Sequence, residues 1–499
     1  MAEPVDVVIV GGGHNGLVAS GYLAQAGLRV RLLERLGHVG GAAVSAHAFD
    51  GVDVRVSRYS YLVSLLPPRI VEDLGASVRL AQRRFSSYTP DPGTAGRTGL
   101  LVGSQGLPGA AEFYRLCQLV TDKLWPTLLE PLPTRQQARR STDAAAWHAI
   151  IEEPIGRAIA DAVRDDLVRG VIATDALIGT FARLDDPSLR QNICFLYHVL
   201  GGDWNVPIGG MGAVTTALAA AAESHGAEIT TGAEVYAIDP DGEVRYRTGD
   251  DEHRIAGQYV LANVTPAVLA GLLGEPPPPL TQGAQVKVNM VLRRLPRLRD
   301  ENVTPEEAFA GTFHANETWT QLDSAYSQAA AGHLPDPLPC EAYCHSLTDP
   351  SILSEALRES GAHTMTVFGL HTPHSLGAAP ADLTEAVLTS MNSVLAEPIQ
   401  DALLTDKHGR PCIETTTTAD LQNTLGMTAG NIFHGALSWP FAEEDDLLGT
   451  PARQWGVATA HARIMLCGSG TRRGGAVSGI GGHNAAMAVL ASYRASMPT

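Results

Sequence analysis

The chain is poor in basic residues and has no long apolar run. Its 36 lysines and arginines face 53 acidic residues, a net charge of −17, which disfavours broad electrostatic binding to nucleic acid or anionic lipid. No stretch of about 18 apolar residues suggests a membrane-spanning helix, and no charged segment precedes the first apolar run, as a signal peptide would require. We therefore expect a soluble, cytoplasmic protein, with peripheral membrane contact through an apolar patch left open.

Cysteine is also sparse. The six cysteines lie far apart and form no paired framework, which is typical of a reducing compartment. Cys340, Cys344 and His345 could share a metal ion, but the spacing is loose and no second ligand pair follows. The sequence predicts no metal site.

The N-terminal region carries the pattern of a βαβ unit. Residues 5–10 (VDVVIV) predict a buried parallel strand, and residues 11–16 (GGGHNG) form a G-x-G-x-x-G turn. A helix is expected over about 15–26, and a second strand over 28–33 ends at Glu34. Strand, glycine loop, helix, strand and acid at these offsets together indicate dinucleotide binding.

Each part of this motif has a mechanical reason. Gly11 permits a tight turn, Gly13 lets the backbone approach a pyrophosphate, and Gly16 allows close packing of helix on strand. The helix N-terminus offers unpaired N–H groups and the positive end of its dipole to the phosphates. Glu34 is placed to accept hydrogen bonds from a ribose diol, and its charge disfavours the 2′-phosphate of NADP.

Two further segments repeat this pattern of glycine loop and adjacent strand or helix. Residues 207–212 (PIGGMG) precede an alanine-rich helix over 213–225, and 233–238 predicts a strand. Near the other end, an apolar strand over 462–467 leads into the glycine-rich segment 468–482. A helix is expected to begin near Asn484.

Several of these segments together resemble phytoene-dehydrogenase-like flavoproteins of the carotenoid desaturase and amine oxidase superfamily. The matching segments are 11–19, 34–35, 39–43, 57–66, 431–435 and 467–486. Among these flavoproteins, the chain is most similar to the pyridine nucleotide-disulfide oxidoreductase domain-containing protein 2 group. The resemblance implies FAD as cofactor. In such proteins a glycine pair like that at 40–41 passes beside the FAD diphosphate, whereas NAD-dependent dehydrogenases lack it.

The resemblance also implies which residues hold FAD. The C-terminal glycine loop and the following helix N-terminus would stabilise negative charge on a reduced flavin. Many relatives have an acid where this chain has Ser469, which weakens the hydrogen bond expected there. The cofactor-binding residues expected are Gly11, Gly13, His14, Asn15, Gly16, Glu34, Arg35, Gly40, Gly41, Ala42, Val235, Gly468, Ser469, Gly479, Ile480, His483 and Asn484.

The fold expected is α/β, a discontinuous Rossmann-type FAD-binding domain with an inserted mixed-sheet substrate domain and a helical cap. The FAD-binding domain would comprise residues 1–75, 200–275 and 421–499. Residues 76–199 would form the helical cap or substrate region, and 276–420 the substrate-binding domain. N- and C-terminal segments must then fold together.

Catalytic residues are harder to predict, because hydride transfer to flavin N5 needs mainly a well-positioned C–H bond. Arg58, Tyr59 and Tyr61 follow the glycine pair where relatives line the cavity, and His434 lies in a matching segment near the C-terminus. Tyrosine or histidine could accept a proton, although packing or substrate contact is the simpler role for each. A flavin-linked disulfide reaction is rejected, because no cysteine precedes Cys117.

The leading hypothesis is an FAD-dependent dehydrogenase or oxidase that desaturates a C–C bond of an apolar or amphipathic molecule, such as a carotenoid, isoprenoid or lipid. Amine oxidation at a C–N bond is the alternative within the same fold. A cofactor-free binding protein of the GDP-dissociation-inhibitor type is a third reading, which the intact glycine loops argue against. The expected partners are the small-molecule substrate and an electron acceptor such as oxygen or a quinone.

Overall fold

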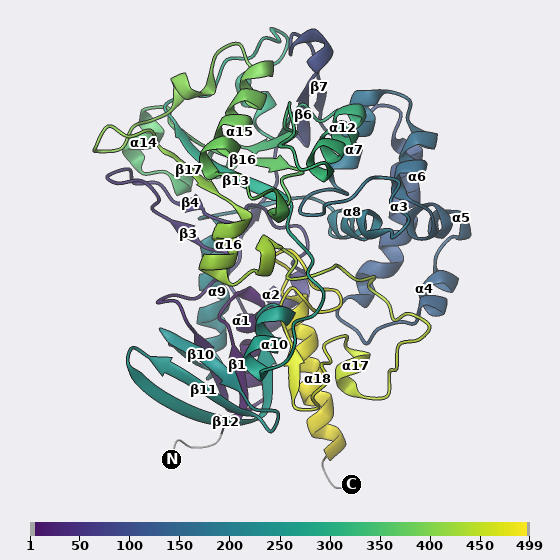
Figure 1. The fold of residues 1–499 in the computed structure, drawn as a ribbon, viewed down its shortest axis with the longest axis vertical. Coiled ribbons are helices and arrows are strands. Elements are labelled where there is room, and N and C mark those ends of the chain that lie inside the picture. The colour runs from purple at the N-terminus through teal and green to yellow at the C-terminus, as the bar shows by residue number, and fades with distance from the viewer. Residues whose placement is uncertain (1–4, 497–499) are drawn as a thin grey trace.

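A computed structural model describes residues 5–496, arranged as two seven-stranded sheets at opposite ends of an elongated molecule, with a helical region beside the second (Figure 1). The first sheet has the order β10-β11-β12-β1-β2-β9, and β18 pairs with β12. Its strands are β1 (Val5–Val10), β2 (Val30–Glu34), β9 (Glu228–Thr231), β10 (Ala233–Ile238), β11 (Glu243–Thr248), β12 (Asp251–Ala262) and β18 (Ile464–Leu466).

The parallel strands that carry the N-terminal motif, β1 and β2, are buried along most of their length. β1 pairs in parallel with β2 on one side and with β12 on the other, and β12 pairs in parallel with β18. Valine and isoleucine fill β1, as suits a strand covered on both faces. The helices around this sheet are α1 (His14–Gln25), α2 (Pro68–Leu74), α9 (Met211–Ser224), α10 (Pro266–Leu273), α17 (Pro451–Gln454) and α18 (Ile480–Ser496).

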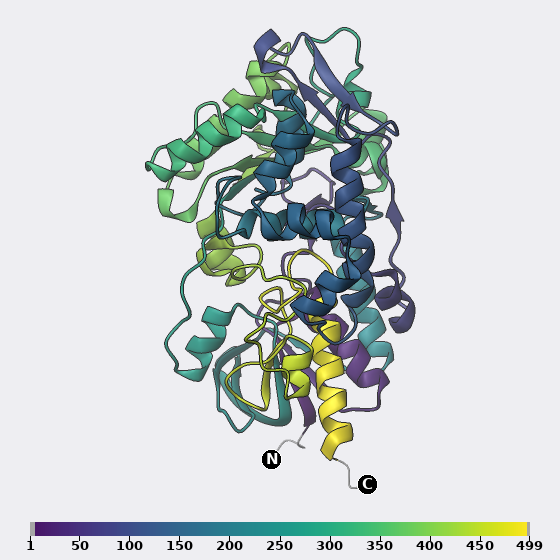
Figure 2. The same cartoon turned by 90° about the vertical axis from the view of Figure 1, so that its right-hand side faces the viewer.

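Helix α1 packs between α9 and α18, so the first and last helices of the chain are neighbours (Figures 1 and 2). Small residues make this close approach feasible. A Cβ atom added at Gly482 in α18 would lie 2.0 Å from the Asn15 carbonyl oxygen in α1. The two ends of the chain therefore share one core, as the sequence predicts.

The second sheet is mixed, with the order β17-β13-β16-β15-β14-β6-β7. Its long central pair, β13 with β16, is antiparallel and almost entirely buried. The strands are β6 (Ser87–Pro90), β7 (Gly99–Val102), β13 (Gln285–Leu292), β14 (Thr312–Ala315), β15 (Cys340–Tyr343), β16 (His363–Leu370) and β17 (Ile413–Thr416). Helices α12 (Trp319–Ala330), α14 (Glu355–Glu359), α15 (Pro380–Val394) and α16 (Thr418–Leu425) accompany it.

Residues 111–200 form the helical region. It has a core of its own around Trp147 and Phe195, both fully buried. Figure 1 shows its helices grouped beside the second sheet. They are α3 (Ala111–Leu124), α4 (Arg135–Ser141), α5 (Ala144–Trp147), α6 (Ile155–Ala162), α7 (Asp166–Thr174) and α8 (Arg190–Leu200). No helix in residues 5–496 is long and apolar enough to cross a membrane.

The fold confirms the α/β class, with differences in detail. β6 and β7 join the mixed sheet, although residues 76–199 were expected to form the cap. Within the expected cap, α6 and α7 are separated by extended backbone at Val163 and Asp165. Helix α18 begins at Ile480 rather than near Asn484. The three-part division of the chain stays a prediction. Residues 1–4 and 497–499 of the predicted FAD-binding domain lie outside the part of the chain that the structure describes.

Candidate functional site

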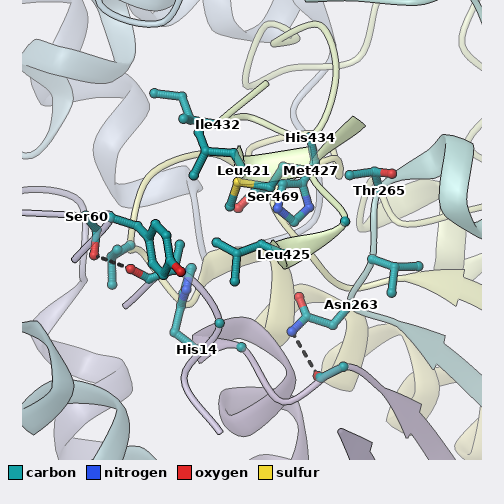
Figure 3. Close-up of a pocket in the computed structure, with 18 of the residues that line it drawn as sticks. His14, Ser60, Asn263, Thr265, Leu421, Leu425, Met427, Ile432, His434 and Ser469 are labelled. Atoms are coloured by element: carbon teal, nitrogen blue, oxygen red, sulfur yellow. Dashed lines mark hydrogen bonds between the residues drawn. The ribbon is translucent and has the colours of Figure 1, made fainter. Parts of the chain in front are cut away.

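One long cavity runs from the N-terminal glycine loop to the face of the second sheet (Figure 3). Its wall is mostly apolar, and its polar groups come from segments far apart in the sequence. The residues that line it include Gly11, Gly13, His14, Glu34, Arg35, Gly41, Ala42, Tyr59, Ser60, Tyr61, His198, Trp204, Glu234, Val235, Asn263, Lys287, Phe368, His434, Ser469, Ala476 and Val477.

The first glycine loop and the glycine pair form one wall of the cavity. Gly40 N–H donates to the Gly12 carbonyl (2.8 Å), and Gly13 and Gly40 are bridged in parallel. A Cβ atom at Gly41 would lie 3.2 Å from the Gly13 Cα. Gly11 and Gly41 both have positive φ, +101° and +56°, which glycine adopts without strain. The two loops predicted to meet a pyrophosphate are thus in contact.

Glu34 lies at the end of β2 and is almost fully buried. Its Oε2 accepts the Gly12 N–H (2.7 Å), and its Oε1 accepts the Leu36 N–H (2.8 Å). A carboxylate offers about four lone-pair positions, so two remain for hydroxyl groups of a bound molecule. Glu34 therefore shapes the loop and retains capacity to accept from a ribose.

Asn263 is a site residue whose role the sequence did not indicate. It follows β12, and its Nδ2 donates to the Gly11 carbonyl (3.0 Å), a contact visible in Figure 3. A Cβ atom at Gly468 would lie 2.9 Å from its Oδ1. Asn263 thus joins the N-terminal loop to the C-terminal loop.

The outer end of the cavity is formed by β10 and the residues after β2. Val235 lines it together with Ala233 and Glu234. Arg35 lines it as well, and its guanidinium donates to the Thr424 carbonyl near the end of α16. Both predicted residues, Val235 and Arg35, therefore lie where an adenosine-like group would reach.

The C-terminal loop contributes fewer lining residues than expected. Ser469, Ala476 and Val477 line the cavity, whereas Gly468, Gly479, Ile480, His483 and Asn484 do not. The His483 ring packs edge-on against Tyr22, and burial lowers its pKa to about 4. Asn484 Nδ2 donates to the Leu128 carbonyl (3.2 Å). These last side chains hold α18 in place, and any cofactor role would pass through the backbone.

Two predicted residues of the first helix are also turned away from the cavity. Asn15 is buried, and its Oδ1 accepts the Gly482 N–H (3.4 Å). Gly16 packs so close to Gly11 that a Cβ atom would meet the Gly11 carbonyl oxygen at 2.2 Å. Both residues shape the loop from behind.

The arginine pair after Thr471 does not face the cavity either. Arg473 is fully buried, and its Nη1 donates to the carbonyls of Thr127 (2.7 Å) and Glu130 (2.6 Å). Arg472 donates to the Phe441 carbonyl (2.6 Å) and pairs with Asp446. Both arginines therefore hold the C-terminal loop and its neighbours.

His14 and His434 lie near one another in the cavity wall (Figure 3). Burial lowers the pKa of each to about 4, and the nearby His434 further lowers that of His14. His14 Nε2 and His434 Nδ1 are buried without a hydrogen-bond partner in the described chain. Both rings are thus neutral at physiological pH, and each has a nitrogen free to bind a ligand.

Of the three candidates after the glycine pair, two line the cavity. Tyr59 and Tyr61 do so, and burial raises the pKa of both hydroxyls. The Arg58 side chain is 45% exposed and pairs with Glu414 at 3.2 Å. Arg58, unlike the two tyrosines, is therefore not among the residues that line the cavity.

Lys287 is a second residue that sequence reasoning missed. It lies in β13, and its Nζ donates to the carbonyls of Ser57 (2.7 Å), Tyr59 (3.0 Å) and Ser60 (3.1 Å). Burial lowers its pKa to about 7. A lysine between two valines of a strand was the signal available in the sequence. Lys287 fixes the segment that carries the two tyrosines.

The inner end of the cavity is aromatic. Tyr61 packs against Phe368 (ring centroids 4.6 Å) and stacks on Trp204 (6.3 Å), and His198 stacks on Trp204 (4.9 Å). These residues come from the loop after β4 (Val56–Ser57), from α8 and its following turn, and from β16. Only the tertiary fold brings them together, and Tyr61 alone was predicted.

Comparison with known proteins agrees with this geometry. Residues 9–69 match the NAD(P)-binding Rossmann-like domain family. The uncharacterized protein Rv0897c of Mycobacterium tuberculosis is 71% identical, with 97% of each chain covered. Pyridine nucleotide-disulfide oxidoreductase domain-containing protein 2 of Mus musculus is 28% identical over 97% of this chain and 93% of its own. A putrescine oxidase solved with putrescine shares the fold at a TM-score of 0.57, 16% identity and 99% coverage of each chain.

The fold is thus that of flavin-type oxidoreductases such as the amine oxidases, and the chain is homologous to the mouse protein. With 71% identity over nearly its whole length, this chain belongs to the family of the mycobacterial protein Rv0897c.

Proposed function

We propose that the protein is an FAD-dependent oxidoreductase that desaturates a C–C bond of an apolar or amphipathic small molecule. The observation that carries the proposal is the single cavity, which joins the contacting glycine loops to an aromatic chamber. A dinucleotide held along the loops would place its far end at that chamber.

The residues present fit FAD. A side chain on Gly41 would fill the space between the two glycine loops, and Glu34 keeps lone pairs for a ribose diol. Gly11, Gly13 and Gly41 would face the diphosphate, and Val235 the adenine. Ala42, Ser60, His434 and Ser469 would surround the inner part of the cofactor. A bound flavin supplies the acceptor for a hydride.

The protein's own residues would position the substrate and exclude water. Tyr61, Trp204 and Phe368 present an apolar, aromatic surface at the inner end, and Lys287 holds the tyrosine segment against β13. Such positioning of a C–H bond is the main demand of hydride transfer. Tyr59 and Tyr61 offer hydroxyl groups to a substrate.

The charge of the cavity wall favours a neutral substrate over an amine. Its only acidic lining residues are Glu34 and Glu234, both at the outer end with Val235. The inner end therefore offers a protonated amine no carboxylate partner. The resemblance to putrescine oxidase concerns the fold, and amine oxidation remains the second candidate.

The first test is the absorption spectrum of the purified full-length protein after incubation with FAD. We expect bound flavin bands and FAD released on denaturation. The next test is anaerobic bleaching of those bands by phytoene, farnesol and oleic acid, compared with putrescine and benzylamine. A colourless protein would refute the cofactor proposal, and bleaching by amines alone would favour the second candidate.

A further inference from the structure

Behind the aromatic chamber, the second sheet buries a cluster of acidic groups. His314 on β14 and Glu341 on β15 are register partners on neighbouring antiparallel strands, so they share a face. Glu317 follows β14. His314, Glu317 and Glu341 are 4%, 0% and 1% exposed. His314 Nδ1 lies 2.5 Å from Glu317 Oε2 and 4.0 Å from Glu341 Oε1.

This cluster contains more acidic than basic side chains. Asp175, at the end of α7, repels Glu341, and Arg83 is the cation that attracts both. Burial first, and then repulsion by Glu317, raises the pKa of Glu341 to about 7. Burial and then repulsion by Glu341 raise the pKa of Asp175 to about 7. The pKa of Glu317 is raised well above its ordinary value. The cluster therefore exchanges a proton near neutral pH.

Glu317 Oε1 is buried and has no hydrogen-bond partner in the described chain. A lone carboxylate oxygen in such a place is costly unless it is protonated or gains a partner. The other oxygen of Glu317, Oε2, is hydrogen-bonded to His314 Nδ1. The cluster thus has room to hold further protons.

Two tyrosines connect the cluster to the cavity. The Tyr343 hydroxyl donates to Glu341 Oε2 at 2.7 Å. The Tyr343 ring lies 4.6 Å from that of Tyr61, and its hydroxyl partly offsets the burial that raises the pKa of the Tyr61 hydroxyl. Tyr61 in turn lines the cavity. Tyr61 and Tyr343, each with a hydroxyl that can carry a proton, therefore lie between the cavity and Glu341.

We propose that Tyr61, Tyr343 and Glu341 form a proton path that carries the substrate's proton from the cavity into the buried cluster. This proposal rests on the proposed function. A bound flavin would supply the acceptor for the hydride, with both electrons, when one substrate C–H bond breaks. The neighbouring C–H bond loses its proton to the Tyr61 oxygen, and its electron pair forms the C=C bond. Tyr61 passes its own proton to Tyr343, which passes one to the Glu341 carboxylate.

The path makes Glu341 a positioning and storage group rather than a substrate contact. Glu341→Gln retains an acceptor for the Tyr343 hydroxyl but cannot take up a proton, and Tyr343→Phe removes the connecting hydroxyl. Asp300→Asn is the matched control, because Asp300 is also a buried acid that accepts from a tyrosine, Tyr88, on the same sheet (3.0 Å).

The first measurement needs no cofactor. Infrared titration of the full-length protein from about pH 5 to about pH 9 should show a protonated carboxyl band that titrates near neutral pH. Glu341→Gln should lose the part of that band that Glu341 contributes, and Asp300→Asn should keep the whole band. A band unchanged in Glu341→Gln would overturn the proposal. So would one divalent cation per purified chain that is lost in His314→Ala, because the cluster would then be a metal site.

The second measurement uses the FAD-reconstituted protein. Its reduction potential, titrated over the same pH range, should show an added inflection near neutral pH, because reduction draws a proton into the cluster. The inflection should vanish in Glu341→Gln and Tyr343→Phe and persist in Asp300→Asn. Potentials that match wild type in both path variants would overturn the proposal. Failure to bind FAD would count against the proposed function alone, since the infrared result stands independently.

Discussion

At the scale of single residues, the cavity depends on a few side chains that serve the backbone. Glu34 and Asn263 hold the first glycine loop through its own N–H and carbonyl groups. Lys287 holds three carbonyls of the tyrosine segment. The conformation of the loop residues nearest to a ligand is thus set by side chains that lie farther from it.

Glu34→Gln should weaken both the loop and dinucleotide binding. The amide replaces one acceptor with a donor, so a buried N–H of Gly12 or Leu36 loses its partner, at a cost of about 1–3 kcal/mol. We expect FAD to bind roughly tenfold more weakly, measured by equilibrium titration of the flavin absorbance. Glu228→Gln is the control, because Glu228 is exposed and pairs with Arg31 at the surface, a contact worth about 0–1 kcal/mol. Equal affinities in both variants would contradict this role.

Lys287 should make stability depend on pH. Burial lowers its folded pKa from 10.5 to about 7, so between these values the unfolded chain binds more protons than the folded one. The free energy of unfolding therefore rises with pH across that window, and this gain is lost as pH falls to about 7. In urea unfolding at several pH values, we expect the free energy of unfolding of Lys287→Met to rise less steeply with pH than that of wild type. Lys123→Met, on an exposed position of α3, should follow wild type. If the free energy of unfolding changes with pH in the same way in all three proteins, the lowered pKa of Lys287 is refuted.

At the scale of elements, the decisive feature is the contact between two glycine loops. A hydrogen bond and a bridge join them, and the gap between Gly13 and Gly41 is too narrow for a side chain. The spacing of glycines predicted each loop separately. Their contact depends on how the segment after β2 turns back over α1, which is a matter of packing.

Gly41→Ala separates backbone strain from loss of this gap. Gly41 has φ +56°, so alanine costs about 1 kcal/mol in any case. Gly75→Ala is the matched control, because Gly75 has φ +62° with no atom within 4 Å of an added Cβ. We expect similar losses of thermal stability, but a lower flavin content only in Gly41→Ala. Equal flavin content in the two purified variants would show that the gap does not serve the cofactor.

At the scale of the whole molecule, the C-terminal segment binds the parts together. Helix α18 packs on α1, and the loop before it reaches the helical region through the buried Arg473. Cavity residues drawn from both sheets thus depend on the last forty residues of the chain.

Arg473→Met should loosen that connection. It leaves the carbonyls of Thr127 and Glu130 without their donor, which costs about 1–3 kcal/mol. We expect a lower melting temperature and faster proteolysis within residues 125–133. The control is Arg463→Met, in which an exposed arginine loses one surface carbonyl contact with Asp241. If both variants melt together, the buried arginine contributes no more than the surface one.

The sequence by itself determined the parts of the protein governed by local chemistry. Glycine at 11, 13, 40 and 41, β-branched residues at 5–10 and the acid at 34 predict strand, turn and helix, because backbone conformation and side-chain periodicity act over a few residues. The class of fold and the dinucleotide loops followed from these patterns. The confirmed strands, such as β1 and β10, lie where these residue patterns are clear.

Only the tertiary structure decided which side chains share the cavity. Arg58, Asn15 and His483 turn away from it, whereas Asn263, Lys287 and Trp204 enter it. The buried chain from Tyr61 to Glu341 joins segments about 280 residues apart. Such contacts depend on sheet register and on the packing of layers that are distant in sequence, and no local pattern specifies them.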